Sequence, residues 1–162
     1  MKIILVFFSF LFINFSTYAD GHSGKIHIEG FGAWSLNIMN AGNGNLSVTY
    51  DGLYSGVAMN GTQFGNNASV QCVGGLTASK GKINDETGMC KFLFANGDTA
   101  FIKYTGTGEI GKNGTSNYEF IGGTGKYKSI SGSGTVTRIS IQAAKKGFSQ
   151  TKNIFKGSYK LN

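Results

Sequence analysis

The sequence contains no proline, one tryptophan, two cysteines and two histidines in 162 residues. Without proline its turns depend on glycine and asparagine, which adopt positive φ angles at little cost, and glycine is abundant at 26 residues. Both histidines, His22 and His27, lie far along the chain from both cysteines. This scarcity argues against a Cys–His metal site and against a catalytic thiol with an imidazole partner. We therefore expect no metal and no cofactor.

Acidic residues are also few, eight against fifteen lysines and arginines, so the formal net charge is +7. A basic surface can attract nucleic acid, anionic lipid or acidic polymers. The lysines are scattered singly, however, and only Lys145 and Lys146 are adjacent. We interpret the charge as an aid to solubility and expect no nucleic-acid partner, with a polyanion-binding surface as the alternative.

One long apolar run stands at the N-terminus. Residues 1–19 read MKIILVFFSFLFINFSTYA, with an early lysine and Thr-Tyr-Ala at the end, which is typical of a secretory signal peptide cleaved after Ala19. The run is shorter than the roughly 20 residues of a spanning helix, and Asn14 interrupts it. We expect residues 20–162 to form a single domain, secreted or periplasmic, with no transmembrane segment after cleavage.

Cys72 and Cys90 are the two cysteines of that domain. In an oxidising compartment a small, even number of cysteines favours a disulfide. Closing a loop of this length stabilises the fold by about 3 kcal/mol in the chain-entropy model. We predict a Cys72–Cys90 disulfide.

Short runs with period-two alternation lie between glycine- and asparagine-rich turns such as NAGNGN, YDG, MNGTQFGNN, ANGD and GKNGTSN. Such spacing predicts an all-β barrel or sandwich, and no amphipathic helix longer than about two turns is evident. The runs are KIHIEGF (25–31), WSLNIM (34–39), LSVTY (46–50), SVQCVGG (69–75), CKFLF (90–94), TAFIKYTG (99–106), SNYEFI (116–121), GTVTRISIQ (134–142) and NIFKGSYKL (153–161).

Two kinds of strand pattern are present. The last run alternates apolar residues with lysines, which predicts an apolar inner face and a solvated outer face. By contrast, CKFLF and AFIKY carry apolar residues on both faces. A strand that is apolar on both sides must be covered on both. This favours a homo-oligomer or an overlying segment.

The segment FIGGTGKYKSISGSGTV, residues 120–136, combines strand alternation with many glycines. Glycines within strands mark bulges, sharp bends and close approaches, which a small barrel needs in order to close. The GGTGK stretch does not match a phosphate-binding loop, because that motif has four residues between its glycines and Ser or Thr after its lysine. Here Tyr127 follows Lys126.

This segment resembles the GGTGKY-x-G-x-x-GSG signature of secreted bacterial proteins in the allene oxide cyclase-like and dirigent-like barrel group, with Ser129 in place of one glycine. The resemblance includes Cys72, the spacer GGLTASKGKINDETG, Cys90 and the stretch ANGDTAFIKYTGTG, and it covers residues 70–138. It implies an antiparallel closed barrel of about eight strands, either filled by side chains or holding one small ligand. The plant members use acidic, arginine and tyrosine residues inside the cup, but the resemblance does not assign these roles to residues of this chain.

The candidate catalytic residues are Glu29 and Glu119, which lie on predicted strands, and Arg138, the only arginine. Most other acidic residues fall at predicted turns. An inward carboxylate would have a raised pKa, and an inward guanidinium could grip an anionic ligand. Burial statistics instead favour outward, solvated side chains for all three.

Aromatic residues are the candidates for lining a ligand cavity, although aromatic stripes on strands also form plain cores. They are Trp34, Tyr50, Tyr54, Phe64, Phe101, Tyr104, Tyr118, Tyr127 and Tyr159.

The leading hypothesis is an exported, non-enzymatic barrel that binds a small, partly apolar molecule or acts as an envelope interaction module. One alternative is a cyclase or isomerase like the plant relatives. Another is a carbohydrate- or polyanion-binding surface protein.

Overall fold

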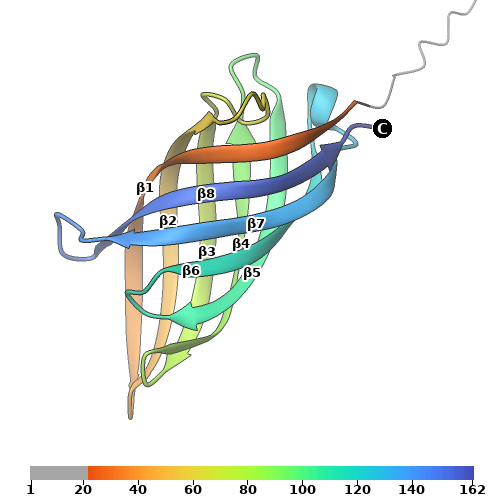
Figure 1. The fold of residues 1–162 in the computed structure, drawn as a ribbon. Helices are drawn as coiled ribbons and strands as arrows, with labels where there is room; N and C mark the ends of the chain where they lie inside the picture. Colours follow the sequence, from red (N-terminus) through yellow and green to blue (C-terminus); the bar gives the residue numbers. More distant parts are fainter. Residues whose placement is uncertain (1–21) are drawn as a thin grey trace, which may run out of the picture.

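The computed structural model describes residues 22–162, and the predicted signal peptide, residues 1–19, lies outside the described residues. Eight antiparallel strands follow one another around a closed barrel (Figure 1). This confirms the predicted fold class. The strands are β1 (Ser23–Gly42), β2 (Asn45–Ala58), β3 (Ser69–Ser79), β4 (Lys82–Leu93), β5 (Thr99–Glu109), β6 (Gly114–Gly123), β7 (Ser131–Ile141) and β8 (Phe148–Lys160), with a 3₁₀ turn η1 (Gly125–Tyr127) between β6 and β7.

Closure comes from the pairing of the first and last strands. Each strand pairs with its neighbours in sequence, and β1 pairs with β8 from Ser23 opposite Lys160 to Ser35 opposite Phe148. A closed barrel leaves no free sheet edge, so every strand is protected from edge-to-edge association. Among the described residues, no helix is long and apolar enough to cross a bilayer.

The structure corrects two details of the predicted strand pattern. The runs at 25–31 and 34–39 form one continuous strand, and the Asp51–Gly52 pair, predicted as a turn, lies in the middle of β2. Gly52 faces inward beneath the indole of Trp34, and a Cβ at this position would come within 2.2 Å of the ring. The glycine therefore makes room for a large side chain instead of turning the chain.

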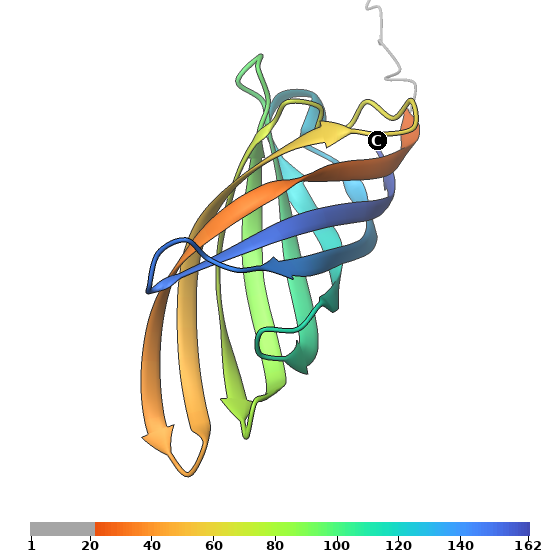
Figure 2. The ribbon, with the colours of Figure 1, turned by 60° about the vertical axis from the view of Figure 1, so that its left-hand side comes forward.

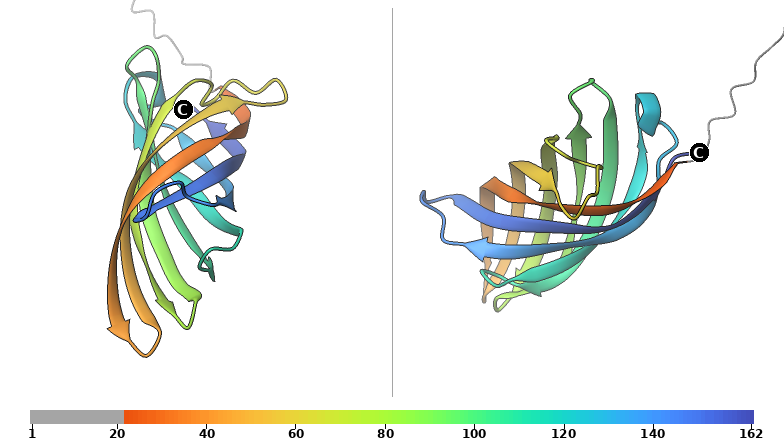
Figure 3. Two further views of the ribbon diagram at one scale, coloured as in Figure 1. Left: turned by 90° about the vertical axis from the view of Figure 1, so that its left-hand side faces the viewer. Right: turned by 45° about the horizontal axis from the view of Figure 1, so that its top comes forward.

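The two ends of the barrel differ in how the strands are joined. At one end, called here the hairpin end, short connections link β1 to β2, β3 to β4, β5 to β6 and β7 to β8, and the β1–β2 hairpin projects furthest (Figures 1 and 2). At the other end, called here the closed end, lie the β2–β3 loop, the β4–β5 turn, η1 and the C-terminus (Figure 3).

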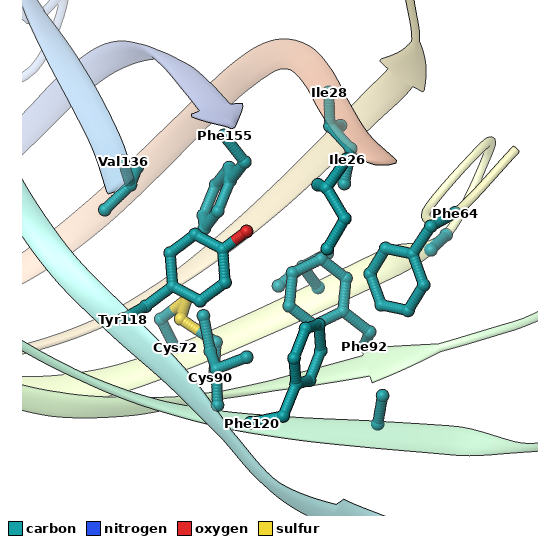
Figure 4. Packing of buried hydrophobic residues seen from close by; sticks show 14 of the residues in the cluster. Ile26, Ile28, Phe64, Cys72, Cys90, Phe92, Tyr118, Phe120, Val136 and Phe155 are labelled. Carbon is teal, nitrogen blue, oxygen red and sulfur yellow. A yellow bond between two sulfur atoms is a disulfide. The ribbon is translucent and has the colours of Figure 1, made fainter. Parts of the chain in front are cut away.

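A cluster of aromatic rings fills the closed end. Phe64, from the β2–β3 loop, folds inward and is only 3% exposed. Its ring centroid lies 5.2–5.7 Å from five others, and Figure 4 shows it beside Phe92 and Phe120. Such tilted and edge-to-face contacts add to the burial of apolar area. The loop thus acts as a plug. The five neighbouring rings are those of Phe92, Phe94, Phe120, Tyr127 and Tyr159.

The predicted disulfide is confirmed. Cys72 on β3 and Cys90 on β4 stand directly opposite each other in the ladder, and both sulfurs point into the barrel. The bond joins two adjacent strands beneath the aromatic cluster (Figure 4).

The glycine signature has a structural role at the closed end. Gly125 begins η1 with a φ of +53°, and a Cβ there would overlap the carboxylate of Asp98. That carboxylate accepts a hydrogen bond from the backbone N–H of Lys126 at 3.2 Å. Tyr127 then stacks on Phe94 with ring centroids 4.3 Å apart. The signature therefore builds the β6–β7 turn and seats an aromatic plug residue.

Candidate functional site

The half of the barrel toward the hairpin end is hollow. It encloses a cavity of about 240 Å³ that runs from the disulfide out to the exposed side chains of Ile38 and Ile110. This volume lies just below the roughly 300–1,000 Å³ that is usual for sites of drug-sized ligands. Most of the wall is apolar, including Leu36, Leu46, Val48, Leu76, Ile83 and Val136.

A buried ion pair stands in this apolar wall. Glu86 on β4 is 2% exposed, and both of its carboxylate oxygens accept hydrogen bonds from the guanidinium of Arg138 on β7. Ser116, between them on β6, accepts a further bond from Arg138 Nη2 at 3.2 Å. A fork-to-fork arrangement of this kind fixes both side chains in position. Each charge is therefore neutralised by a specific partner.

Two tyrosine hydroxyls extend the network on the other side of Glu86. Tyr50 donates to Glu86 Oε1 at 2.7 Å, and its oxygen lies 2.7 Å from the hydroxyl of Tyr104. Because the proton of Tyr50 goes to the carboxylate, Tyr104 must be the donor between the two hydroxyls. Gly88 leaves space for this contact, since a Cβ there would come within 2.2 Å of the Tyr104 oxygen.

The environment keeps these groups in fixed protonation states. Burial, together with the neighbouring Tyr104 and Glu86, raises the pKa of Tyr50 above its ordinary value. Burial likewise raises the pKa of Tyr104 to about 12. Burial alone would lower the pKa of Arg138, but its bonds and charge interaction with Glu86 outweigh this and raise the pKa. At neutral pH the tyrosines are thus neutral hydrogen-bond donors and the arginine is a cation.

A second polar chain lies in the wall formed by β1 and β8. The indole N–H of Trp34 donates to Thr151 Oγ1 at 2.8 Å, and Thr151 donates to Asn153 Oδ1 at 3.1 Å. Asn153 stands directly beside Arg138 in the β7–β8 ladder. The two polar groups therefore meet in the same cavity.

The structure divides the aromatic candidates into three groups. Trp34, Tyr50, Tyr54 and Tyr104 line the cavity, and Tyr54 and Tyr104 also belong to the buried core. Phe101 faces outward on β5, because its neighbour Ile102 is fully buried inside. The remaining candidates, Phe64, Tyr118, Tyr127 and Tyr159, pack in or against the core and do not line the cavity.

The charged candidates are divided as well. Glu29 lies on the outer side of β1 and pairs with Lys152 at 2.7 Å, and the hydrogen bond from Lys152 lowers its pKa. Glu119 is also on the outside, paired with Lys103 at 2.6 Å. Neither faces the cavity. Arg138 points inward, contrary to the outward orientation favoured by burial statistics, because Glu86 supplies a buried partner.

Sequence reasoning missed Glu86, which was assigned to a spacer between the cysteines. A signal for it existed, since Glu86, Gly88, Cys90 and Phe92 all share one parity on a single strand. Continuing the alternation of CKFLF four residues toward the N-terminus places Glu86 on the same inward face as Cys90 and Phe92. Asn153 could have been placed inside in the same way, because it shares its parity on β8 with Phe155 and Tyr159.

No group of three or more metal-ligating side chains is found among residues 22–162. Apart from the exposed Glu109 and Lys112, the polar side chains that line the cavity are a neutralised ion pair, hydroxyls and the Asn153 amide. Such a set can orient a small molecule by hydrogen bonds.

No protein-family model matches the chain, and no curated protein matches it. Among solved structures, the chain is similar to that of a pterocarpan synthase dirigent protein, with a TM-score of 0.54. The match has 14% sequence identity and covers 86% of this chain and 92% of the other. At this identity the likeness concerns the fold. It supports the dirigent-like barrel that the glycine signature predicts.

Proposed function

We propose that this protein binds a small, largely apolar molecule in the hollow half of its barrel. The observation that carries the proposal is the combination of an apolar cavity with a few fixed polar groups, Glu86, Arg138, Tyr50 and Tyr104. Ligand sites in general share this composition, in which apolar walls supply affinity and a few polar groups set orientation.

The ion pair itself supports a binding role. A buried ion pair adds little net stability compared with well-packed apolar residues, because desolvation offsets the attraction. A barrel selected for stability alone could fill this half with side chains, as the closed end does. The retained cavity and its polar groups favour recognition of a ligand.

Export from the cytoplasm is part of the proposal. The signal-like residues 1–19 and the Cys72–Cys90 disulfide support a secreted or periplasmic location, since disulfides persist in oxidising compartments. The resemblance of the glycine signature to secreted bacterial barrel proteins agrees with it.

The binding test uses a variant that fills the cavity. Leu36→Trp places an indole in the cavity wall, whereas Val57→Trp puts the same group on the outer face of β2, where Val57 is 53% exposed. A thermal-shift and native mass spectrometry screen would use lipids, terpenoid-like compounds and phenolics. A ligand at one hundred times its Kd should stabilise the folded state by about 2.7 kcal/mol.

We expect binding to the wild-type protein and to Val57→Trp, and loss of binding in Leu36→Trp. If no compound of this size and polarity binds the wild-type protein, the proposal is wrong. Binding that survives unchanged in Leu36→Trp would move the site elsewhere.

A cyclase or isomerase is the second candidate function, and the protonated tyrosine pair favours it. Tyr104 donates to Tyr50 and Tyr50 donates to Glu86, so a proton that a substrate gives to the Tyr104 oxygen can pass along this chain to the carboxylate, which then acts as the base. Cyclisation and isomerisation leave the atoms of the substrate unchanged in number, so no co-reactant is required. The test is turnover of a bound compound with Tyr104→Phe as the variant: turnover should fall more than tenfold while binding persists.

A further inference from the structure

The four short connections at the hairpin end lie together (Figures 2 and 3) and form a rim around the opening of the cavity. The rim is defined here as residues 38–46, 79–83, 109–114 and 141–148. Backbone hydrogen bonds of 2.8–3.0 Å link the β1–β2, β3–β4 and β5–β6 turns in that order and tie the β7–β8 connection to β1. The donor and acceptor pairs are Lys80 N–H to Gly44 O, Ile110 N–H to Gly81 O, and Leu36 N–H to Gly147 O. Because the connections are bonded together, their exposed side chains belong to one surface.

The rim is strongly basic. It carries five lysines and one acidic residue, Glu109, which stands opposite Lys82 in the β4–β5 ladder. Its formal charge of +4 is therefore more than half of the +7 of the whole chain. All five lysines are exposed, and none forms an ion pair with an acidic side chain among residues 22–162. They come from three separate connections, and closure of the barrel gathers them at one end: Lys80, Lys82, Lys112, Lys145 and Lys146.

The rim also exposes apolar side chains to water. Met39 on the projecting β1–β2 hairpin is 64% exposed, and Ile110 in the β5–β6 turn is 44% exposed. Ile38 and Phe148 are exposed as well, and Lys145 Nζ lies 4.9 Å from the centroid of the Phe148 ring. Binding to a membrane surface grows with the apolar area that enters the acyl boundary and with the attraction of cations to anionic lipids. The rim combines both features.

We propose that the rim docks on an anionic lipid bilayer, with its lysines at the lipid phosphates and the side chains of Ile38, Met39 and Ile110 inserted among the acyl chains. This goes beyond the proposed function, because it rests on the rim and not on what the cavity holds. Since Ile38 and Ile110 also line the cavity, its opening faces the bilayer in the docked state. An apolar ligand then passes between membrane and cavity without crossing water.

Charge and composition favour a bilayer over two other occupants of the rim. A soluble polyanion would contact the lysines but leave the exposed apolar side chains in water, which is unfavourable. A second copy docked rim to rim would bring together two surfaces of the same positive charge, and their repulsion opposes association. An anionic membrane matches both the lysines and the apolar side chains.

The experiment measures binding to vesicles by co-sedimentation. One set of vesicles contains equal amounts of phosphatidylcholine and phosphatidylglycerol, and the other contains phosphatidylcholine alone. All proteins are expressed as the full chain and checked by mass to carry the same N-terminus, so only the substituted side chains differ. Melting temperatures verify that each variant is folded, as expected for substitutions of exposed side chains.

Two pairs of variants separate the rim from the rest of the surface. The charge variant combines Lys80→Gln, Lys112→Gln and Lys146→Gln, and its control removes three exposed lysines at the closed end. The apolar variant combines Met39→Ser with Ile110→Ser, and its control replaces an exposed methionine and an exposed isoleucine on the outer side of the barrel. The controls are Lys25→Gln with Lys128→Gln and Lys160→Gln, and Met89→Ser with Ile121→Ser.

We expect the wild-type protein to bind the phosphatidylglycerol vesicles and to bind phosphatidylcholine alone far more weakly. Each lysine near an anionic surface contributes about fivefold in affinity, so the charge variant should bind about a hundredfold more weakly. The apolar variant should lose about tenfold, because less apolar area is buried. Both controls should stay within about threefold of the wild type, since at about 0.1 M salt charges more than about 10 Å from the membrane are largely screened.

Failure of the wild-type protein to bind either kind of vesicle would overturn the docking proposal and leave the proposed ligand site standing. An equal loss in the charge variant and its control would show that net charge alone causes the binding, and would also overturn it. Full binding by the apolar variant would overturn insertion into the bilayer and favour a soluble polyanion. Self-association of the wild type that the apolar variant abolishes, measured by light scattering, would assign the rim to a second copy instead.

Discussion

The two halves of this barrel are built from the same strands, but the interior of one is filled with side chains and that of the other is hollow. At the closed end, Phe64 enters from a loop and joins a cluster of rings that leaves little free space. At the hairpin end, the inward positions include glycines and polar side chains besides the apolar wall, among them Gly88, Glu86 and Asn153, and a cavity remains. The Cys72–Cys90 disulfide lines the cavity and also belongs to the buried core.

The comparison shows how a small barrel can be stable and hollow at once. Apolar burial at the closed end supplies stability at roughly 25 cal/mol per Å². Because the closed end supplies this stability, the other half can keep buried polar groups that contribute little to the free energy of folding. The division also supports the proposed ligand site, since the closed end needs no ligand to explain its residues, whereas residues with unpartnered polar atoms line the cavity.

The largest expected effect comes from breaking the ion pair in the hollow half. Arg138→Leu leaves the Glu86 carboxylate buried without its cation, and the free energy of unfolding should fall by about 3–5 kcal/mol. Urea denaturation followed by circular dichroism measures this change. The double variant Glu86→Leu with Arg138→Leu is the control, and it should recover most of the loss because no unpaired charge remains. A single variant as stable as the wild type would show that Glu86 is not a buried anion.

Truncating the plug should have the next largest effect. Phe64→Ala removes a ring packed against five others, and we expect a loss of about 3–4 kcal/mol in the free energy of unfolding. Leu36→Ala, in the cavity wall, should cost about 1 kcal/mol, since the cavity already borders that side chain. Similar losses in the two variants would contradict the division of the barrel into a filled and a hollow half.

Alkaline pH should lower the free energy of unfolding through Tyr104, whose pKa rises from 10.0 to about 12 on folding. Below pH 10 the hydroxyl is protonated in both states, so stability does not change. Between pH 10 and 12 the unfolded state loses this proton first, and stability should fall by about 2–3 kcal/mol at 1.36 kcal/mol per pKa unit. Urea midpoints measured across this range test the prediction, with Tyr104→Phe as the variant that should show a shallower fall. Identical pH profiles would rule out Tyr104 as a source of the loss.

The smallest effect on stability is expected on the outer face. Phe31 and Leu53 are 66% and 69% exposed, near other apolar side chains such as Val73 and Met89 on neighbouring strands. Replacing both with serine should change the free energy of unfolding of the monomer by about 0.5 kcal/mol or less. The strands with apolar residues on both faces favour a second copy that covers this surface. If such a copy binds, light scattering should show that the wild type associates and the variant does not. Lys91→Ser is the control, and a monomeric wild type would exclude the homo-oligomer.

Much of the fold could be predicted from local patterns. Period-two alternation identified most of the strands, the asparagine–glycine pairs marked most of the turns, and the two cysteines indicated their own bond. The exceptions have a physical cause. Gly52 has the sequence of a turn but lies in a strand because Trp34 needs the space above it, and that contact joins residues on different strands.

The candidate site was much less accessible to sequence reasoning. Arg138 was singled out as the only arginine, but its inward orientation depends on Glu86, which lies 52 residues away along the chain. Tyr50, Tyr54, Tyr104 and Trp34 were named among the aromatics, yet nothing local distinguishes them from Tyr118, Tyr127 and Tyr159, which do not line the cavity.

The sequence by itself determined the alternation of strands, the positions of most turns, the disulfide and the closed-barrel signature, because each depends on residues near one another or on their count. Only the tertiary structure decided that the barrel is half filled, that Glu86 meets Arg138, and that Asn153 and Tyr54 lack partners. These depend on register around a closed ring of eight strands, where a side chain's environment is set by strands distant in sequence. Closure converts inward-facing positions into either a core or a cavity, and the volume contributed by all eight strands together decides which one forms.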